Sequence, residues 1–226
     1  MKILAVADKE TDALWNWRGN QKQYEGVDLI LSCGDLKPEY LEFLVSMANC
    51  PLLYVRGNHD DHYRERPPEG CLDIDGRVAD YRGLRIMGLG GSMRYRKGIN
   101  MYGEDEMRAR AERLNRSVRV RRGVDLFVSH APAAGYGDQP DLPHRGFSCF
   151  DDLLWKHRPA YMLHGHVHPS YGKWKKEYEH PGGTRILNAY GALWLEIGED
   201  EYPARGKTGS LLYDWYTSFA GEDAIL

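Results

Sequence analysis

Short apolar runs alternate with amphipathic segments in the first quarter of the chain. Residues 2–7, 27–32 and 51–56 are predominantly apolar and are bounded by glycines and polar residues, which is typical of buried parallel strands. Residues 38–49 carry apolar side chains in helical phase and begin with a proline, which the first turn of a helix favours. The polar stretch 11–26 has room for one more helix. Strands that alternate with helices predict right-handed crossovers and an open sheet.

The pattern then changes to a hairpin before the alternation resumes. Residues 77–91 predict an antiparallel hairpin that turns at Arg82 and Gly83. We expect strands at 124–132 and 160–166, helices from about Glu104 and at 148–158, a glycine- and proline-rich loop at 131–146, and antiparallel edge strands at 184–197 and 209–216. Because the sequence contains no repeat and no low-complexity tract, we expect one α/β domain over residues 1–226.

Composition and charge narrow the class of protein. A chain of 226 residues with 42% apolar side chains can bury a core without disulfides or metals. The net charge of −3 gives no overall basic field, so we expect no membrane partner and disfavour nucleic acid, which local basic patches leave open. The apolar run at the N-terminus is too short for a signal peptide or a membrane span, and the four cysteines show no CxxC spacing. These features predict a cytoplasmic protein with reduced thiols.

A basic segment at about 92–122 stands out from this balanced composition. It contains ten lysine or arginine residues, and its second half has the pattern of a helix. The sequence leaves two interpretations open. The segment is either a solvated surface helix or a lid that attracts a ligand carrying phosphate.

Polar side chains with metal-binding chemistry follow the predicted buried strands. The stretch HGHVH at 164–168 alone holds three of the nine histidines. Carboxyl ends of parallel strands lie along one edge of a sheet, where ligands bind. We therefore expect seven donor side chains to converge there: Asp8, Glu10, Asp35, Asn58, His130, His166 and His168.

So many polar groups need a cation to hold them together. Asp8, Glu10 and Asp35 repel one another as carboxylates, and their desolvation at a sheet edge is costly. One metal ion would use about four to six donors. Two divalent ions roughly 3.5 to 4 Å apart would use all seven, with one carboxylate bridging. The sequence therefore predicts a binuclear metal centre.

The motifs that carry these donors resemble a known family. ADKE at 7–10, GDLKP at 34–38, GNHD at 57–60, SHAP at 129–132 and GHVH at 165–168 are similar, in this order, to the motifs of calcineurin-like metallophosphoesterases. The resemblance covers residues 2–168, about three quarters of the chain. It implies a four-layer αββα sandwich of two mixed β-sheets flanked by helices.

The resemblance also implies a role for each donor. Asp8 and His168 would bind the first metal ion, and Asp35 would bridge the two ions. The second ion would be bound by Asn58, His130 and His166. His59 would stay free of metal as the catalytic acid or charge stabiliser, with Asp60 orienting its ring. A hydroxide that bridges the ions would attack the phosphorus of a phosphate mono- or diester.

One position departs from the family pattern. Glu10 stands where these proteins usually have a histidine. We expect Glu10 to ligate the first ion through oxygen, which makes the site harder and favours Mn2+ or Mg2+. Mn2+ is the expected native metal, and Mg2+, Fe, Zn2+ and Ni2+ stay open as alternatives. The alternative is that Glu10 turns to solvent and the first site weakens.

These inferences predict a cytoplasmic hydrolase of a small phosphorylated substrate, including nucleotide-like molecules. Asn58, His59, His144 and Arg145 are the candidate substrate-binding residues, the last two because their loop would cross the site. Two other functions stay open, namely a metallophosphoesterase-fold scaffold with little or no turnover and, with less support, a nuclease. His59 favours the enzyme, because a scaffold has no physical need for a metal-free histidine beside two cations.

Overall fold

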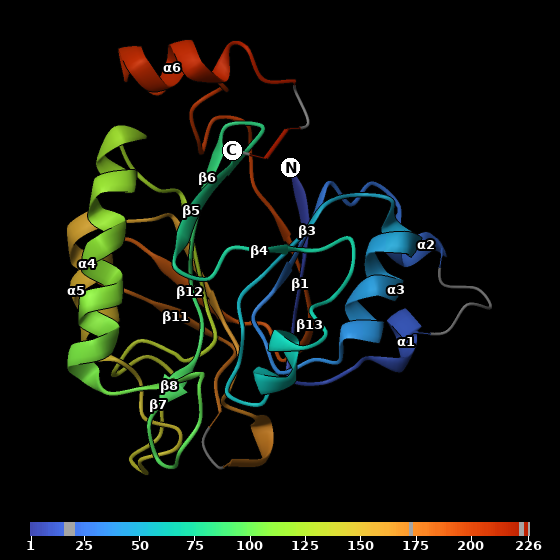
Figure 1. The fold of residues 1–226 in the computed structure, drawn as a ribbon, viewed down its shortest axis with the longest axis vertical. Coiled ribbons are helices and arrows are strands. Elements are labelled where there is room, and N and C mark those ends of the chain that lie inside the picture. The colour runs from blue at the N-terminus through green and yellow to red at the C-terminus, as the bar shows by residue number, and fades with distance from the viewer. Residues whose placement is uncertain (16–20, 172–173, 222–223, 226) are drawn as a thin grey trace.

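Two mixed β-sheets pack face to face between two groups of helices (Figure 1). The structure is a computed structural model that describes residues 1–15, 21–171, 174–221 and 224–225. The first sheet has the strand order β13-β1-β2-β3-β4, in which β1 to β4 are parallel and β13 is antiparallel to β1. Its strands are β1 (Lys2–Ala7), β2 (Leu29–Ser32), β3 (Leu52–Tyr54), β4 (Leu72–Asp73) and β13 (Gly191–Glu196).

The second sheet has the order β11-β12-β10-β9-β6-β5. Its four inner strands are parallel, and β5 and β11 are antiparallel edges. The strands are β5 (Arg77–Tyr81), β6 (Leu84–Leu89), β9 (Leu126–Ser129), β10 (Tyr161–His164), β11 (Glu177–Glu179) and β12 (Arg185–Asn188). A separate parallel pair joins β7 (Ser92–Met93) to β8 (Met101–Tyr102).

Helices cover the outer face of each sheet. The first sheet is covered by α1 (Asp12–Trp15), α2 (Gln21–Tyr24) and α3 (Pro38–Ala48), and the second by α4 (Glu104–Val120) and α5 (Ser148–His157). Two short 3₁₀ helices, η1 (Asp60–Arg64) and η2 (Pro169–Tyr171), follow motif residues, and α6 (Leu211–Thr217) lies near the C-terminus.

Three apolar layers hold these four structural layers together. In β1, Ile3 and Ala5 pack between the two sheets, whereas Leu4 and Val6 face the helices on the other side. This alternation follows from the twofold period of a strand, and it explains why β1 is apolar at consecutive positions. A third cluster joins the second sheet to α4 and α5. The predicted four-layer sandwich of two mixed sheets is therefore confirmed.

Most predicted elements lie close to their expected bounds. The predicted hairpin turns where expected, with φ of 52° at Arg82 and 94° at Gly83, the left-handed conformations that two-residue hairpin turns require. Residues 131–146 form a loop without helix or regular strand. The helix expected within 11–26 is present as α1 and α2, and residues 16–20 lie outside the described residues.

The C-terminal part differs from the prediction in two ways. The stretch 184–197 is not one edge strand, because β12 lies inside the second sheet, parallel to β10, and β13 forms the edge of the first sheet. The predicted strand at 209–216 is wrong, since these residues begin α6. The Asp214 carboxylate accepts hydrogen bonds from the backbone N–H groups of Thr208 and Gly209, which fixes the start of this helix. A short apolar run alone cannot distinguish the two structures.

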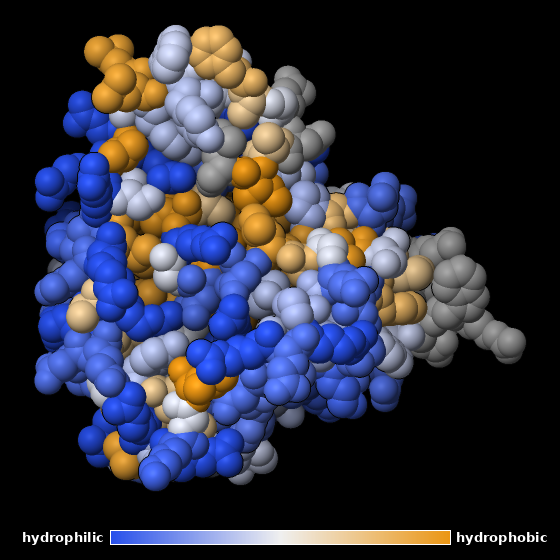
Figure 2. Space-filling model, in the orientation of Figure 1, coloured by the Kyte–Doolittle hydropathy of each residue, from blue (hydrophilic) through white to orange (hydrophobic). Residues whose placement is uncertain are grey.

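The outward face of α6 is apolar. Leu211, Leu212 and Trp215 are 90%, 80% and 65% exposed, and Figure 2 shows hydrophobic residues gathered at the top of the molecule, where α6 lies. Trp215 lies on this helix and is exposed rather than packed on a sheet. Trp194 lies on β13, and its side chain is partly exposed. Among the described residues, no helix combines the length and apolar character needed to span a bilayer.

The basic segment at 92–122 consists of two different parts. Its second half is α4, which packs Met107, Ala111 and Leu114 against the second sheet and is therefore a surface helix. Its first half contains β7, β8 and the loop between them, residues 94–100. Contacts of this loop with Asn58 and His59 place it beside the motif residues.

Candidate metal centre

Parallel strands of both sheets end at the same place, and the motif residues follow them directly. Asp8 follows β1, Asp35 follows β2 and His166 follows β10. All three have left-handed backbones, with φ of 62°, 57° and 67°. This backbone conformation is strained for residues with a Cβ, and residues that adopt it are frequently found at functional sites. The chain therefore turns sharply at the end of each strand, where each of these side chains enters the site.

Glycines of the motifs allow the carboxylates to approach the backbone. A Cβ on Gly57 would overlap the Asp35 carboxylate, and a Cβ on Gly165 would overlap the carboxylate of Asp8. Both Asp8 oxygens accept a hydrogen bond from the backbone N–H of His166, at 2.9 and 3.0 Å. The glycines thus leave room for the two carboxylates to lie against the backbone, and hydrogen bonds from His166 hold Asp8 there.

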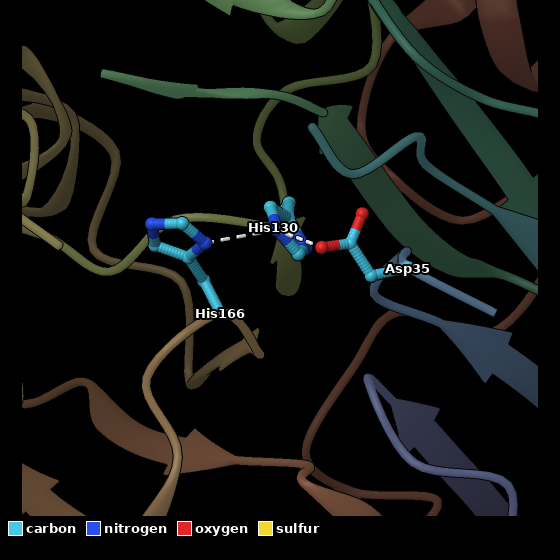
Figure 3. A group of neighbouring side chains, drawn as sticks. All are labelled: Asp35, His130 and His166. Atoms are coloured by element: carbon cyan, nitrogen blue, oxygen red, sulfur yellow. Dashed lines mark hydrogen bonds and ion pairs between the residues drawn. The ribbon is translucent and has the colours of Figure 1, made fainter. Parts of the chain in front are cut away.

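Four potential ligand atoms converge at this edge, from Asn58 and from the three side chains that Figure 3 shows, Asp35, His130 and His166. His130 Nε2 lies 3.0 Å from Asn58 Oδ1, 3.1 Å from His166 Nδ1 and 3.3 Å from Asp35 Oδ2. The side chains of His130 and Asn58 are buried, so little water reaches this cluster. Asp35, His130 and His166 offer ligand atoms that all lie within 4.8 Å of one another.

Backbone carbonyls fix the tautomers of both histidines in this cluster. His130 Nδ1 lies 2.8 Å from the carbonyl oxygen of Cys33, and His166 Nε2 lies 2.7 Å from that of Pro143. A carbonyl only accepts hydrogen bonds, so each neutral ring places its N–H there. His130 Nε2 and His166 Nδ1 then each carry a lone pair that can bind a cation. Metal-binding histidines are usually held in this way. The donor set fits a divalent cation.

Electrostatics in the cluster favour a positive charge. Burial opposes the charged form of His130, but the Asp35 carboxylate beside it raises the pKa of His130 to about 9. Burial and the neighbouring His130 lower the pKa of His166 to about 3, so this ring is neutral at physiological pH. Although burial of Asp35 works in the opposite direction, His130 holds the pKa of that carboxyl well below its usual range. A proton on His130 thus occupies the place where a cation would bind.

A second group lies beside the first. His168 Nε2 is 3.3 Å from Asp8 Oδ1, and the Asp8 side chain is only 1% exposed. The His168 ring stacks on Tyr171 and also contacts Tyr190, each with 4.8 Å between ring centroids. Asp8 and His168 are thus placed together, as the first metal ion would require.

Glu10 points to the same opening but has a different partner. Its Oε1 lies 3.5 Å from Nζ of Lys37, an exposed residue. Together with Asp8, Asp35 and His59, both side chains line an open pocket of about 400 Å³. Glu10 is therefore positioned at the site but ion-paired with Lys37.

The structure corrects the expected role of Asp60. This buried carboxylate makes no hydrogen bond to the His59 ring; its Oδ2 instead accepts the backbone N–H groups of Gly57, at 2.7 Å, and Asp35, at 2.8 Å. Burial and the nearby Asp35 raise the pKa of Asp60 to about 7. The exposed His59 lines the pocket, and its backbone N–H donates to Asp35 Oδ1 at 2.8 Å. Asp60 therefore holds the GNHD turn against Asp35.

The two candidates on the 131–146 loop differ in placement. His144 Nδ1 lies 2.6 Å from Asp141 Oδ2, and its ring is 5.4 Å from the His166 ring and 4.2 Å from Tyr171, measured between centroids. Arg145 is exposed and makes no hydrogen bond or ion pair with any residue that the structure describes. The structure thus brings His144, but not Arg145, into contact with the metal-site cluster.

Sequence reasoning missed two groups of site residues. The carbonyls of Cys33 and Pro143 cannot be recognised because any residue type supplies a backbone oxygen. Tyr95 and Arg96 come from the basic segment, and their contacts with Asn58 and His59 depend on the path of the loop. The run of cations at 94–97 was the available signal, although it did not indicate which residue reaches the site.

Comparisons with known proteins identify the family and the fold of the chain. Residues 1–170 match the family model described as calcineurin-like phosphoesterase. The fold is similar to the crystal structure of TT1561 from Thermus thermophilus, with a TM-score of 0.58 and 19% identity over 84% of this chain and 88% of that chain. A second crystal structure has a TM-score of 0.58 and 14% identity over 86% of this chain and 94% of that chain.

A single mutant of Vps29 from Entamoeba histolytica matches with a TM-score of 0.44 and 15% identity, over 88% of this chain and 87% of that chain. No curated protein matches the sequence. At these identities the similarity to the first two solved structures concerns the fold alone.

Proposed function

Because the chain belongs to the calcineurin-like phosphoesterase family, we propose that it is a metal-dependent hydrolase of phosphate mono- or diesters. The observation that carries the proposal is the convergence of Asp35, His130 and His166, with the Asn58 oxygen 3.0 Å from His130 Nε2. Each of these histidines turns an acceptor nitrogen inward and holds its other nitrogen on a carbonyl. In the metal-free chain a proton on His130 lies among these groups, and a cation that displaces it would satisfy all of the inward-facing acceptors.

We propose two cation sites that share Asp35. Asn58, His130 and His166 would hold one cation, and Asp8 and His168 would hold the other, with Glu10 as a further oxygen ligand once it leaves Lys37. The chemistry supplied by bound divalent cations is an activated water at neutral pH and charge neutralisation on the phosphoryl oxygens. Carboxylates and the Asn58 oxygen favour Mn2+ or Mg2+, and we propose Mn2+.

The chain's own residues would bind the substrate and manage its charge. His59 lines the open pocket beside Asp35 and is not part of the inward-facing donor cluster. It would either stabilise the charge on a phosphoryl oxygen through a hydrogen bond or, as a general acid, protonate the leaving alkoxide, which is worth about 10²- to 10⁴-fold in rate. Asp60 would keep the GNHD turn in place for this purpose. The open pocket suits a small phosphorylated molecule, and nucleotide-like molecules are among the candidates.

The proposal is tested by metal add-back. Protein stripped of metal is supplied with Mn2+, Mg2+ or Zn2+, and hydrolysis of p-nitrophenyl phosphate is compared with that of bis-p-nitrophenyl phosphate. We expect turnover that depends on Mn2+ and that His59→Ala reduces strongly while metal content is retained. His157→Ala is the matched control, since His157 lies at the end of α5 and bonds Asn115. A well-folded sample that hydrolyses neither ester with any metal would instead indicate a scaffold.

A further inference from the structure

The loop between β7 and β8 is attached to the GNHD turn at three points. Tyr95 Oη lies 3.5 Å from Asn58 Nδ2, Arg96 Nη2 lies 3.5 Å from His59 Nδ1, and Asn100 Nδ2 donates to Asp61 Oδ1 at 3.1 Å. Asn100 is buried, which makes its bond the firmest of the three. The loop therefore runs alongside residues 58–61 and places one of its cationic side chains, Arg96, next to His59.

We propose that Arg96 is a positioning residue that fixes the tautomer of His59. A guanidinium has five N–H groups and no acceptor, so a hydrogen bond between these side chains requires a lone pair on His59 Nδ1. The ring proton of neutral His59 then resides on Nε2. The distance of 3.5 Å is long, as catalytic hydrogen bonds often are before substrate binds.

No other group takes this role in the described structure. Asp60, the expected partner of the His59 ring, is occupied by the backbone N–H groups of Gly57 and Asp35. Within the basic run, Arg94 is bound to Glu106 and to the carbonyl of Met101, while Lys97 is exposed and makes no hydrogen bond or ion pair with a described residue. Arg96 is the cation of this loop that contacts His59.

Neighbouring contacts hold Arg96 in place. Its guanidinium carbon lies 5.5 Å from the centroid of the Tyr95 ring, within the range of a cation–π interaction. Tyr95 in turn contacts Asn58, the residue before His59. The guanidinium of this exposed side chain thus contacts both the Tyr95 ring and the His59 imidazole.

The inference deepens the proposed function, on which its kinetic part rests. A neutral imidazole in water populates both tautomers. Binding of Nδ1 to Arg96 would keep the N–H of the neutral ring on Nε2, so that His59 offers a hydrogen bond to a phosphoryl oxygen. Because a guanidinium at Nδ1 opposes protonation of that nitrogen, the contact selects charge stabilisation by His59 over transfer of a proton to the leaving alkoxide. Arg96 would therefore raise kcat through His59 and contribute little to substrate affinity.

The first test reads the tautomer directly and needs no turnover. Two-bond nitrogen–proton NMR spectra of the full chain, metal-free and loaded with diamagnetic Mg2+, show which ring nitrogen of His59 carries the proton. We expect the Nε2–H form in the wild type and a mixture of tautomers in Arg96→Met. A wild-type Nδ1–H form, or an Arg96→Met spectrum identical to that of the wild type, would overturn the proposal whether or not the protein hydrolyses esters.

The second test is kinetic and uses a matched control. Arg96→Met should lower kcat for the ester found to be hydrolysed by about tenfold with KM changed by less than about threefold, and Arg96→Lys should restore most of the loss. Lys97→Met removes the adjacent charge and should leave both constants unchanged. A raised KM with unchanged kcat would mean that Arg96 binds substrate, which contradicts a positioning role. Since Arg96 is exposed, these variants should fold normally.

Discussion

His130 Nε2 and His166 Nδ1 face each other at 3.1 Å, while the opposite nitrogen of each ring points to a backbone carbonyl. Two lone pairs at this distance repel unless a proton or a metal ion lies between them and the nearby oxygens of Asp35 and Asn58.

Removal of one histidine should abolish tight metal binding. His166→Ala deletes a donor whose orientation is fixed by Pro143, and we expect affinity for Mn2+ to fall about 100-fold or more. Isothermal titration of the metal-stripped protein measures this, with His157→Ala as the control that also lacks one imidazole. Equal Mn2+ affinity in His166→Ala and the wild type would contradict the assigned ligand set.

Metal binding should release a proton. The pKa of His130, raised to about 9 in the metal-free protein, lies above its value of about 6.5 in an unfolded chain. His130 is therefore protonated at pH 7, and a cation must displace that proton. We expect about one proton released per protein at pH 7 and almost none above about pH 10.

Titrations in two buffers of different ionisation enthalpy count these protons, and an observed enthalpy that is independent of the buffer would contradict the prediction. The raised pKa of His130 also makes the stability of the metal-free fold depend on pH. A raised pKa stabilises the metal-free fold fully below about pH 6.5, and this contribution is lost as the pH rises through about 9.

Asp60 should act through its acceptor oxygen rather than through its charge. Asp60→Ala leaves two backbone N–H groups without an acceptor, and we expect the free energy of unfolding to fall by about 2–4 kcal/mol. Asp60→Asn keeps an acceptor oxygen and removes a buried charge beside Asp35, so its stability should stay close to that of the wild type. Urea unfolding measures both, and equal losses would contradict this role.

Glu10 should set the metal preference of the first site. Glu10→His replaces a carboxylate oxygen with an imidazole, so the ratio of bound Zn2+ to bound Mn2+ should rise in competition. Lys37→Met removes only the partner of the ion pair and should preserve the wild-type preference for Mn2+. Metal content after dialysis against both ions is the measurement. An unchanged ratio in Glu10→His would show that Glu10 is not a ligand.

The sequence predicted the parallel core because β1, β2 and β3 are buried on both faces and are apolar at nearly every position. It failed at α6, where Leu211, Leu212 and Trp215 are apolar but exposed, so that burial does not explain the pattern. The sequence also did not indicate that β12 pairs with β10, because the partner of a strand depends on which strand edge the chain reaches after a long connection.

The sequence predicted those site residues whose side chains supply the ligand atoms and which come directly after a predicted strand. Asp35, His130 and His166 meet for this reason. The partner of Glu10 was not predictable, since the ion pair joins a half-buried side chain to an exposed lysine of a different loop. The role of Asp60 was predicted wrongly because adjacency to His59 in sequence does not determine the direction of its carboxylate.

The most direct test of the two-cation proposal is anomalous diffraction from crystals grown with Mn2+. We predict two anomalous peaks on either side of Asp35, one bound by Asn58, His130 and His166 and the other by Asp8 and His168. A map without a peak at this edge, with the same side chains still facing one another, would contradict the account.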